Sequence, residues 1–262
     1  GSVVLEPTLE TRHFQLMVEG GIRLAKFGFG RYADPSDGVP QVRLAQEHGQ
    51  IVTCHSGGAS IPGSQPITTE HLLQLRPDVC GHINGGPTSL PLDGVREILD
   101  GSDMALQLVQ AGNLGSSLRI LEEVLARNAL HRVTIGSDTP TGTGVMPLGM
   151  IKTVAELSSL AAIPPEIVWA LASGNCASTW KIDGGRIGVG ERADFVIMDA
   201  PWGGQAADAL GALAIGDIPG ISAVVTEGEL RVERSRNTPG AARSARVLPP
   251  GQEAHERRES SA

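Results

Sequence analysis

The stretch IVTCHSGG, residues 51–58, is an apolar run that reaches a histidine and then stops in small residues. The pattern predicts a buried strand that ends at His55 and then turns through residues 56–58. Such a strand would hold the imidazole of His55 rigidly at the end of a sheet.

Three other apolar runs deliver a polar side chain just before a turn rich in Gly or Pro. These side chains are Lys26, His82 and Asp138, and segments with helical periodicity lie between the runs. Strands that alternate with helices predict parallel βαβ units, and polar strand ends gathered at one end are typical of the catalytic face of a (β/α) barrel. We therefore predict an α/β fold, a partial TIM-like (β/α) barrel, in which Lys26, His55, His82 and Asp138 converge.

Each of these residues also has an ordinary structural explanation. A lysine after a strand is usually solvated or in a surface salt bridge, and a histidine or aspartate near a turn more often caps a helix than binds a metal. Their joint occurrence at equivalent positions, in the order Lys, His, His, Asp, favours a shared site.

This order resembles the metal-dependent amidohydrolase superfamily. The resemblance implies that Lys26, carboxylated on its amine, bridges two metal ions, that His55 and His82 are metal ligands, and that Asp138 binds metal and moves protons. In that family the Lys position is also found as Glu. The segment GRIGVGERADFVI, residues 185–197, is similar to the family's return from the barrel to a β-sandwich, and residues 173–175 are similar to its last barrel helix.

Within the superfamily, the loops resemble those of the enamidases, which hydrolyse cyclic amides. The similar stretches include HSGGASIPGS at 55–64, HINGGPT at 82–88 and PLG at 147–149. The resemblance implies a hydrolase that cleaves the C–N bond of a small cyclic amide through metal-activated water, with Asp138 as the catalytic proton shuttle. It implies one or two divalent ions, zinc or else iron or manganese. The expected substrate-binding residues are Ser56, Gly57, Asn84, Gly85, Gly86 and Thr143.

One family feature is missing, the first-strand His-x-His pair that completes one metal site. The chain's histidines are His13, His48, His55, His71, His82, His131 and His255, and no two are separated by a single residue. The chain therefore resembles the C-terminal two thirds of such an enzyme. We expect the barrel part with the metal site at residues 1–184, a small β-sandwich portion at 185–234, where the periodicity changes to two, and a C-terminal arm and flexible tail at 235–262.

Bulk composition narrows the class of partner. A formal net charge of −8 and an aromatic content of 3% argue against nucleic-acid and anionic-membrane binding, which leaves a small-molecule substrate. No run approaches the roughly 20 apolar residues of a membrane helix, and no signal-peptide pattern is present. We expect a cytoplasmic homo-oligomer.

The three cysteines are expected to be free thiols in a reducing compartment, since they are odd in number and widely spaced. Strand alternation predicts that Cys54 points away from His55 and that Cys80 points the same way as His82.

Two other classes of function remain open at this stage. The same scaffold could open a hydantoin or a lactone, or deaminate, because a fold does not fix a substrate. The chain could also be a non-catalytic subunit that needs a partner to complete the barrel, because an open barrel leaves sheet edges that must be covered.

Overall fold

A computed structural model describes residues 1–140, 144–246 and 248 of the chain. Its centre is a six-stranded sheet in the order β1-β2-β3-β4-β5-β6, in which every neighbouring pair is parallel. The strands are β1 Ser2–Val4, β2 Leu24–Phe27, β3 Ile51–His55, β4 Val79–Gly81, β5 Ala105–Val109 and β6 Val133–Gly136. The predicted α/β class, with part of a (β/α) barrel, is confirmed. The sequence pattern did not reveal β1, a three-residue strand.

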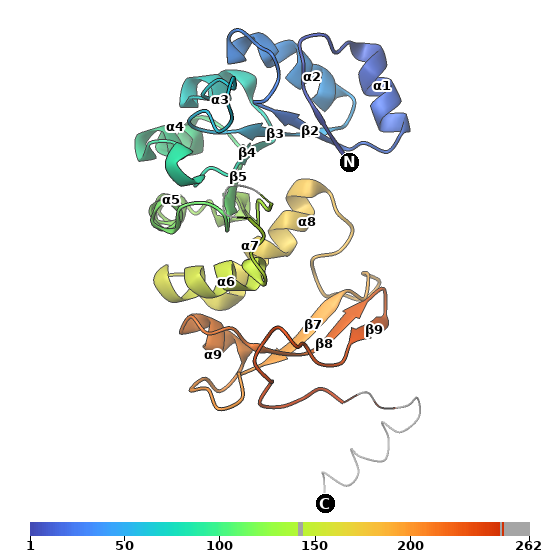
Figure 1. The fold of residues 1–262 in the computed structure, drawn as a ribbon, viewed down its shortest axis with the longest axis vertical. Helices are drawn as coiled ribbons and strands as arrows, with labels where there is room; N and C mark the ends of the chain where they lie inside the picture. Colours follow the sequence, from blue (N-terminus) through green and yellow to red (C-terminus); the bar gives the residue numbers. More distant parts are fainter. Residues whose placement is uncertain (141–143, 247, 249–262) are drawn as a thin grey trace, which may run out of the picture.

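Helices alternate with these strands along the chain, and the first six of them cover the outer side of the sheet (Figure 1). Their bounds are α1 Thr11–Glu19, α2 Val39–Glu47, α3 Thr69–Leu75, α4 Leu92–Gly101, α5 Leu114–Ala126, α6 Gly149–Leu160, α7 Pro165–Ala172, α8 Gly174–Trp180 and α9 Ala209–Ala214, with 3-10 turns at Pro35–Gly38, Gly86–Thr88 and Leu130–Arg132. Glu10 is the N-cap residue of helix α1. Helices α7 and α8 are separated at Ser173, which has φ −125° and ψ −83°.

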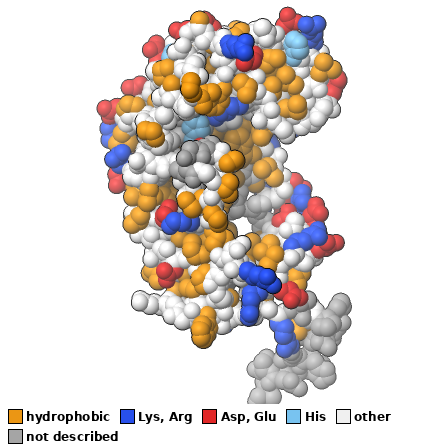
Figure 2. Space-filling view, viewed as in Figure 1, with side chains coloured by type: hydrophobic (Ala, Val, Ile, Leu, Met, Phe, Trp, Pro, Cys, Tyr) orange, Lys and Arg blue, Asp and Glu red, His pale blue; other side chains and the backbone are white. Residues whose placement is uncertain are grey.

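Strands β3 to β6 are largely buried because both of their faces are covered along most of their length, whereas the edge strand β1 is partly exposed. Strands β3 and β5 each have only their middle residue partly exposed. Apolar side chains from the helices pack onto the sheet from outside, for example Phe14, Leu72 and Ile120, all at most 1% exposed. Figure 2 shows that the face drawn there is hollowed near its middle and that hydrophobic side chains border the hollow.

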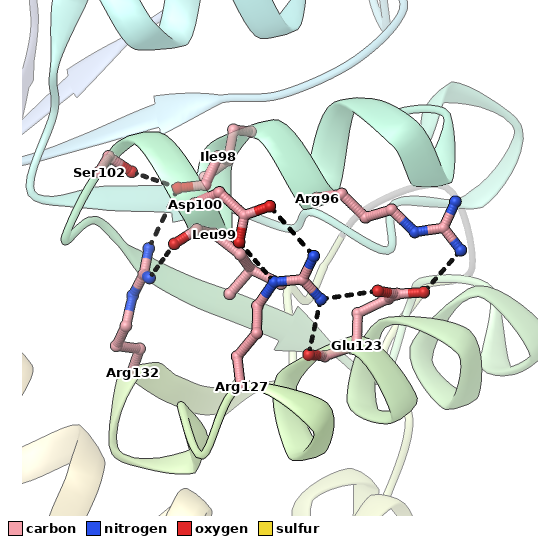
Figure 3. A network of polar contacts seen from close by, with 8 residues as sticks. All are labelled: Arg96, Ile98, Leu99, Asp100, Ser102, Glu123, Arg127 and Arg132. Carbon is pink, nitrogen blue, oxygen red and sulfur yellow. Dashed lines mark hydrogen bonds and ion pairs between the residues drawn. The ribbon is translucent and has the colours of Figure 1, made fainter.

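Helices α4 and α5 are tied together by charged groups on the outside of the barrel part (Figure 3). Glu123 accepts hydrogen bonds from Arg96 and Arg127, each with one contact of 2.6–2.7 Å. Arg132 donates to the backbone oxygens of Leu99 and Met104 at 2.9–3.0 Å, which satisfies carbonyls at and beyond the end of α4. These contacts stabilise the scaffold, and they lie away from the carboxyl ends of the strands.

The C-terminal part holds an antiparallel sheet in the order β7-β8-β9. Its strands are β7 Phe195–Asp199, β8 Gly220–Thr226 and β9 Glu229–Val232. It is one sheet, where a sandwich would pair it with a second, and it joins the barrel part through α9, which contacts α6 and α7. The chain then returns along this sheet, where Arg243 forms a salt bridge of 2.6 Å with the buried Asp199. Of the predicted arm and tail at 235–262, residues 247 and 249–262 lie outside the described residues.

Within the described ranges, none of the helices combines the length and the apolar character that a bilayer crossing requires.

Candidate metal site at the carboxyl ends of the strands

Three of the predicted ligands lie against one another. Lys26 belongs to β2, His55 is the last residue of β3, and His82 follows β4 directly. The Nδ1 atom of His55 lies 3.2 Å from Nε2 of His82, and Nζ of Lys26 lies 3.4 Å from the same Nε2 atom. The two imidazole centroids are 4.7 Å apart. The carboxyl ends of three neighbouring strands thus bring three nitrogen atoms to one point.

The hydrogen bonding of His55 decides which of its nitrogens is available. Its Nε2 atom is 2.7 Å from the carbonyl oxygen of Gly58. A carbonyl only accepts, so Nε2 carries the proton and Nδ1 presents a lone pair toward His82. An outer partner of this kind is typical of metal-binding histidines, because it fixes both the tautomer and the ring orientation.

The spacing of the ring nitrogens suits a shared cation. Two nitrogens bound tetrahedrally at 2.0–2.1 Å from zinc are separated by roughly 3.4 Å, close to the 3.2 Å observed. Among residues 1–140, 144–246 and 248, no group of three or more His, Cys, Asp or Glu is placed to hold a metal ion. Lys26 lies next to the two histidines, and its amine would offer carboxylate oxygens to a metal ion only if it were carboxylated.

The direction of His82 departs from strand alternation. A Cβ added at Gly81 would lie 3.2 Å from Nζ of Lys26, so position 81 faces the site and the next residue of a regular strand would face away. His82 instead has a left-handed φ of 39°, which turns its ring back toward His55. Cys80 packs in the core, with its sulfur 3.8 Å from that of Met104. The expectation that Cys80 and His82 share a face is therefore wrong, because the strand ends between them.

Burial shapes the protonation of the cluster. Removal from water lowers the pKa of the Lys26 amine and of the His55 imidazole, and it lowers the pKa of His82 to about 3, with the nearby Lys26 charge adding to the effect. The ring of Phe29 lies beside both groups, 5.6 Å from Nζ of Lys26 and 5.3 Å from the His55 ring. At neutral pH the two imidazoles are uncharged, the form that binds a metal.

Asp138 follows β6 and adopts a left-handed φ of 55°. Its negative charge reaches the cluster, since it raises the pKa values of Lys26 and His55 against the stronger effect of burial. The structure therefore brings Asp138 to the same end of the sheet as Lys26, His55 and His82.

Two expected substrate-binding side chains are engaged in the scaffold. The buried hydroxyl of Ser56 donates to the carbonyl of Gly81 at 2.8 Å. The amide of Asn84, 1% exposed, donates to the Val109 oxygen and to the Ser117 hydroxyl at 2.8–2.9 Å, and accepts from the Val109 N–H. Both side chains hold the loops in place rather than point into open space.

The glycines expected at the pocket differ in how crowded they are. At Gly57, with φ 94°, an added Cβ would lie only 1.6 Å from the Thr88 oxygen, so only glycine fits. At Gly85 it would lie 2.7 Å from the His82 oxygen, whereas beside Gly86 there is open space. Thr143 lies outside the described residues.

The sequence pattern missed Gln107, in the middle of β5. Its Oε1 atom accepts a hydrogen bond of 3.3 Å from the backbone N–H of His82. The available signal was a single polar residue inside the apolar run ALQLV, residues 105–109.

Comparison with known proteins gives one strong match. The chain is 41% identical over 249 residues to the enamidase of Eubacterium barkeri, a match that includes 95% of the chain and 64% of that protein. The chain thus spans less than two thirds of this curated relative. No family model matches it.

Solved structures agree with this result. The crystal structure of enamidase, described as a member of the amidohydrolase superfamily, superposes with a TM-score of 0.90 at 40% identity, over 95% of this chain and 65% of that one. A β-aspartyl dipeptidase from Fervidobacterium islandicum, at 14% identity and a TM-score of 0.54, matches 91% of this chain and 62% of its own. A triazine hydrolase variant, at 18% and 0.56, matches 87% and 55%. These two share the fold alone, whereas the identity and superposition with enamidase show that this chain belongs to the amidohydrolase superfamily.

Proposed function

We propose that the protein is a metal-dependent hydrolase that cleaves the C–N bond of a small cyclic amide. The observation that carries the proposal is the meeting of His55 Nδ1, His82 Nε2 and Lys26 Nζ within 3.2–3.4 Å, at the end of a barrel where such enzymes have their active sites. The 41% identity to enamidase supports the choice of substrate class.

His55 and His82 would hold a divalent cation through the two facing nitrogens, with a carboxylated Lys26 as the third ligand. A cation bound there supplies two things that amide hydrolysis needs: it lowers the pKa of water from 15.7 toward about 7 and polarises the carbonyl. The protein's own contribution is to fix the ligands, because the Gly58 carbonyl holds the His55 ring in one tautomer.

The environment of Lys26 favours carboxylation. Burial lowers its pKa, which increases the fraction of uncharged amine at neutral pH. The ammonium form would first lose one proton to solvent. The neutral nitrogen would then attack the carbon of CO2, so that an N–C bond forms, one C=O π bond opens and a second N–H proton leaves to solvent. With two protons lost, the cationic amine becomes an anionic carbamate. The product replaces a buried positive charge, which is costly, with a group able to bind metal.

Asp138 would transfer the proton during the reaction. An amide nitrogen is a poor leaving group until it is protonated, so a carboxylate that takes a proton from the attacking water and gives it to that nitrogen removes the main obstacle. Asp138 is suited to this because it follows β6, at the same end of the sheet, and its charge acts on Lys26 and His55.

The substrate ring would lie against small groups and Phe29. Space is open beside Gly86, and the Phe29 ring sits next to His55 and Lys26. An apolar ring face beside an uncrowded loop suits a flat, mostly apolar heterocycle, whose carbonyl then points to the ligand cluster.

A substrate panel tests the proposal. Protein expressed from the complete gene and loaded with zinc, iron or manganese is assayed with six-membered cyclic amides, cyclic imides, hydantoins, lactones and aminopurines. The proposal expects a cyclic amide to have the highest kcat/KM. Faster opening of a lactone or hydantoin, faster deamination, or no turnover of any compound by the metal-loaded protein, contradicts it.

A further inference from the structure

We propose that Gln107 is the positioning residue that turns His82 into the metal site, an inference that rests on the proposed function. The register of β4 with β5 ends at the pair Cys80 and Leu106. Beyond this pair, the residues after β4 are hydrogen-bonded to β5 through the two oxygens of Gln107. Its backbone oxygen accepts the N–H of Ile83 at 3.0 Å, and its side-chain Oε1 accepts the N–H of His82 at 3.3 Å.

This double contact falls where the chain reverses its direction. His82 has φ 39°, a left-handed backbone that costs free energy in any residue with a Cβ. Such a conformation persists only when its surroundings hold it. Without this turn the imidazole would follow strand alternation and face away from Lys26, as the position of Gly81 shows. The Gln107 amide therefore secures the backbone geometry on which the ligand direction depends.

The neighbouring strand leaves room for the Gln107 side chain. An added Cβ at Gly136 would lie 3.0 Å from Nε2 of Gln107, closer than side chains normally approach. A glycine at the end of β6 thus keeps the amide in its place between β4 and β6. Even an alanine at this position would press on it.

The chemistry of the contact predicts which replacements work. The His82 N–H is a donor, so the partner must present an oxygen at the reach of a Gln side chain. Glutamate keeps that oxygen, whereas leucine has a similar volume and no acceptor. If Gln107 positions His82, the oxygen acceptor is required. If Gln107 only fills space, leucine should serve as well.

The experiment measures the zinc dissociation constant of the metal-stripped protein by competition with a chromophoric chelator. Gln107→Leu is expected to weaken zinc binding roughly 10- to 100-fold, the range for loss of an outer partner of a metal ligand. Gln107→Glu is expected to stay within a few-fold of the native protein. The matched control is Gln50→Leu, a glutamine 2% exposed that donates to the Ile22 oxygen and directly precedes β3, at the opposite end from His55. It is expected to lower stability and leave zinc affinity unchanged.

Further variants separate the possible failures. His82→Ala removes a ligand, and unchanged zinc affinity in it would refute the metal site itself. If His82→Ala loses zinc while Gln107→Leu binds it as the native protein does, or if Gln107→Glu fails as badly as Gln107→Leu, the positioning role is overturned. Should Gln107→Leu not fold, Gly136→Ala is measured instead. The inference expects weaker zinc binding in that variant too, and native affinity would overturn it.

Discussion

Charged groups occur in two contrasting settings, on the outer helices and at the strand ends. On helices α4 and α5, Glu123 lies between Arg96 and Arg127, whose hydrogen bonds hold the pKa of that carboxyl below its usual range (Figure 3). At the strand ends, Lys26 and His82 lie against each other, and burial lowers the pKa of both. The first setting stabilises charge, and the second suppresses it.

The difference separates scaffold from function. Opposite charges paired in the open need nothing further, and each pair contributes little to stability. A cluster of bases held together out of water is unfavourable by itself, and strong perturbation of this kind concentrates at functional sites. A ligand bound at the strand ends can therefore offset the free-energy cost of holding these bases together out of water. Substitutions in one setting test whether it is independent of the other.

The largest expected effect is on turnover. Asp138→Asn removes the group that moves the proton, so kcat with a cyclic amide should fall by about 10²-fold or more, the usual scale for an acid–base residue. The matched control is Asp93→Asn, which removes one carboxylate from Arg96 on the outside of α4. Steady-state kinetics should show native turnover in the control. Full activity in Asp138→Asn would remove Asp138 from the mechanism.

The next effect is on stability alone. Arg132→Leu leaves the carbonyls of Leu99 and Met104 without their charged donor, and hydrogen bonds to charged groups contribute about 1.5–3 kcal/mol each. Urea denaturation should show a loss of about 3 kcal/mol with zinc affinity unchanged. Arg96→Ala, which removes the surface ion pairs with Asp93 and Glu123, should cost less than Arg132→Leu. A loss of zinc binding in Arg132→Leu would show that the two settings are coupled.

A smaller effect is expected from pH. The pKa of His82 is lowered from 6.5 to about 3 in the folded protein. Between these values the unfolded chain takes up a proton that the folded chain does not, so the unfolding free energy of chelator-treated protein should fall as pH drops from about 6.5 toward 3. His82→Asn should make this fall shallower. Equal slopes in native and His82→Asn protein would contradict the burial of a neutral His82.

The strand ends were the most predictable part of the molecule. A polar residue that closes an apolar run, as Lys26 and His55 do, is placed at a sheet end by periodicity alone. What periodicity cannot give is the rotation of the chain after the strand. Cys80 and His82 were expected on one face, yet the left-handed backbone at His82 separates them.

Side-chain partners were also beyond the sequence pattern. Asn84 was expected at the substrate, but its amide donates hydrogen bonds to the Val109 oxygen and the Ser117 hydroxyl. Gln107, which was not singled out, contacts the backbone of a candidate ligand. Both facts depend on which strands lie next to each other. A local sequence pattern predicts the burial of its own residues but not their partners on other strands. The confirmed fold thus came from local pattern, and the detail of the site from long-range contacts.

The most direct test of the account is a crystal structure of the protein grown with zinc, with anomalous diffraction recorded at the zinc absorption edge. The account predicts a zinc peak about 2.0–2.1 Å from both His55 Nδ1 and His82 Nε2, with density for a carboxylated Lys26 as a further ligand. A map in which the two imidazoles remain hydrogen-bonded to each other, with zinc bound elsewhere or not at all, would contradict it.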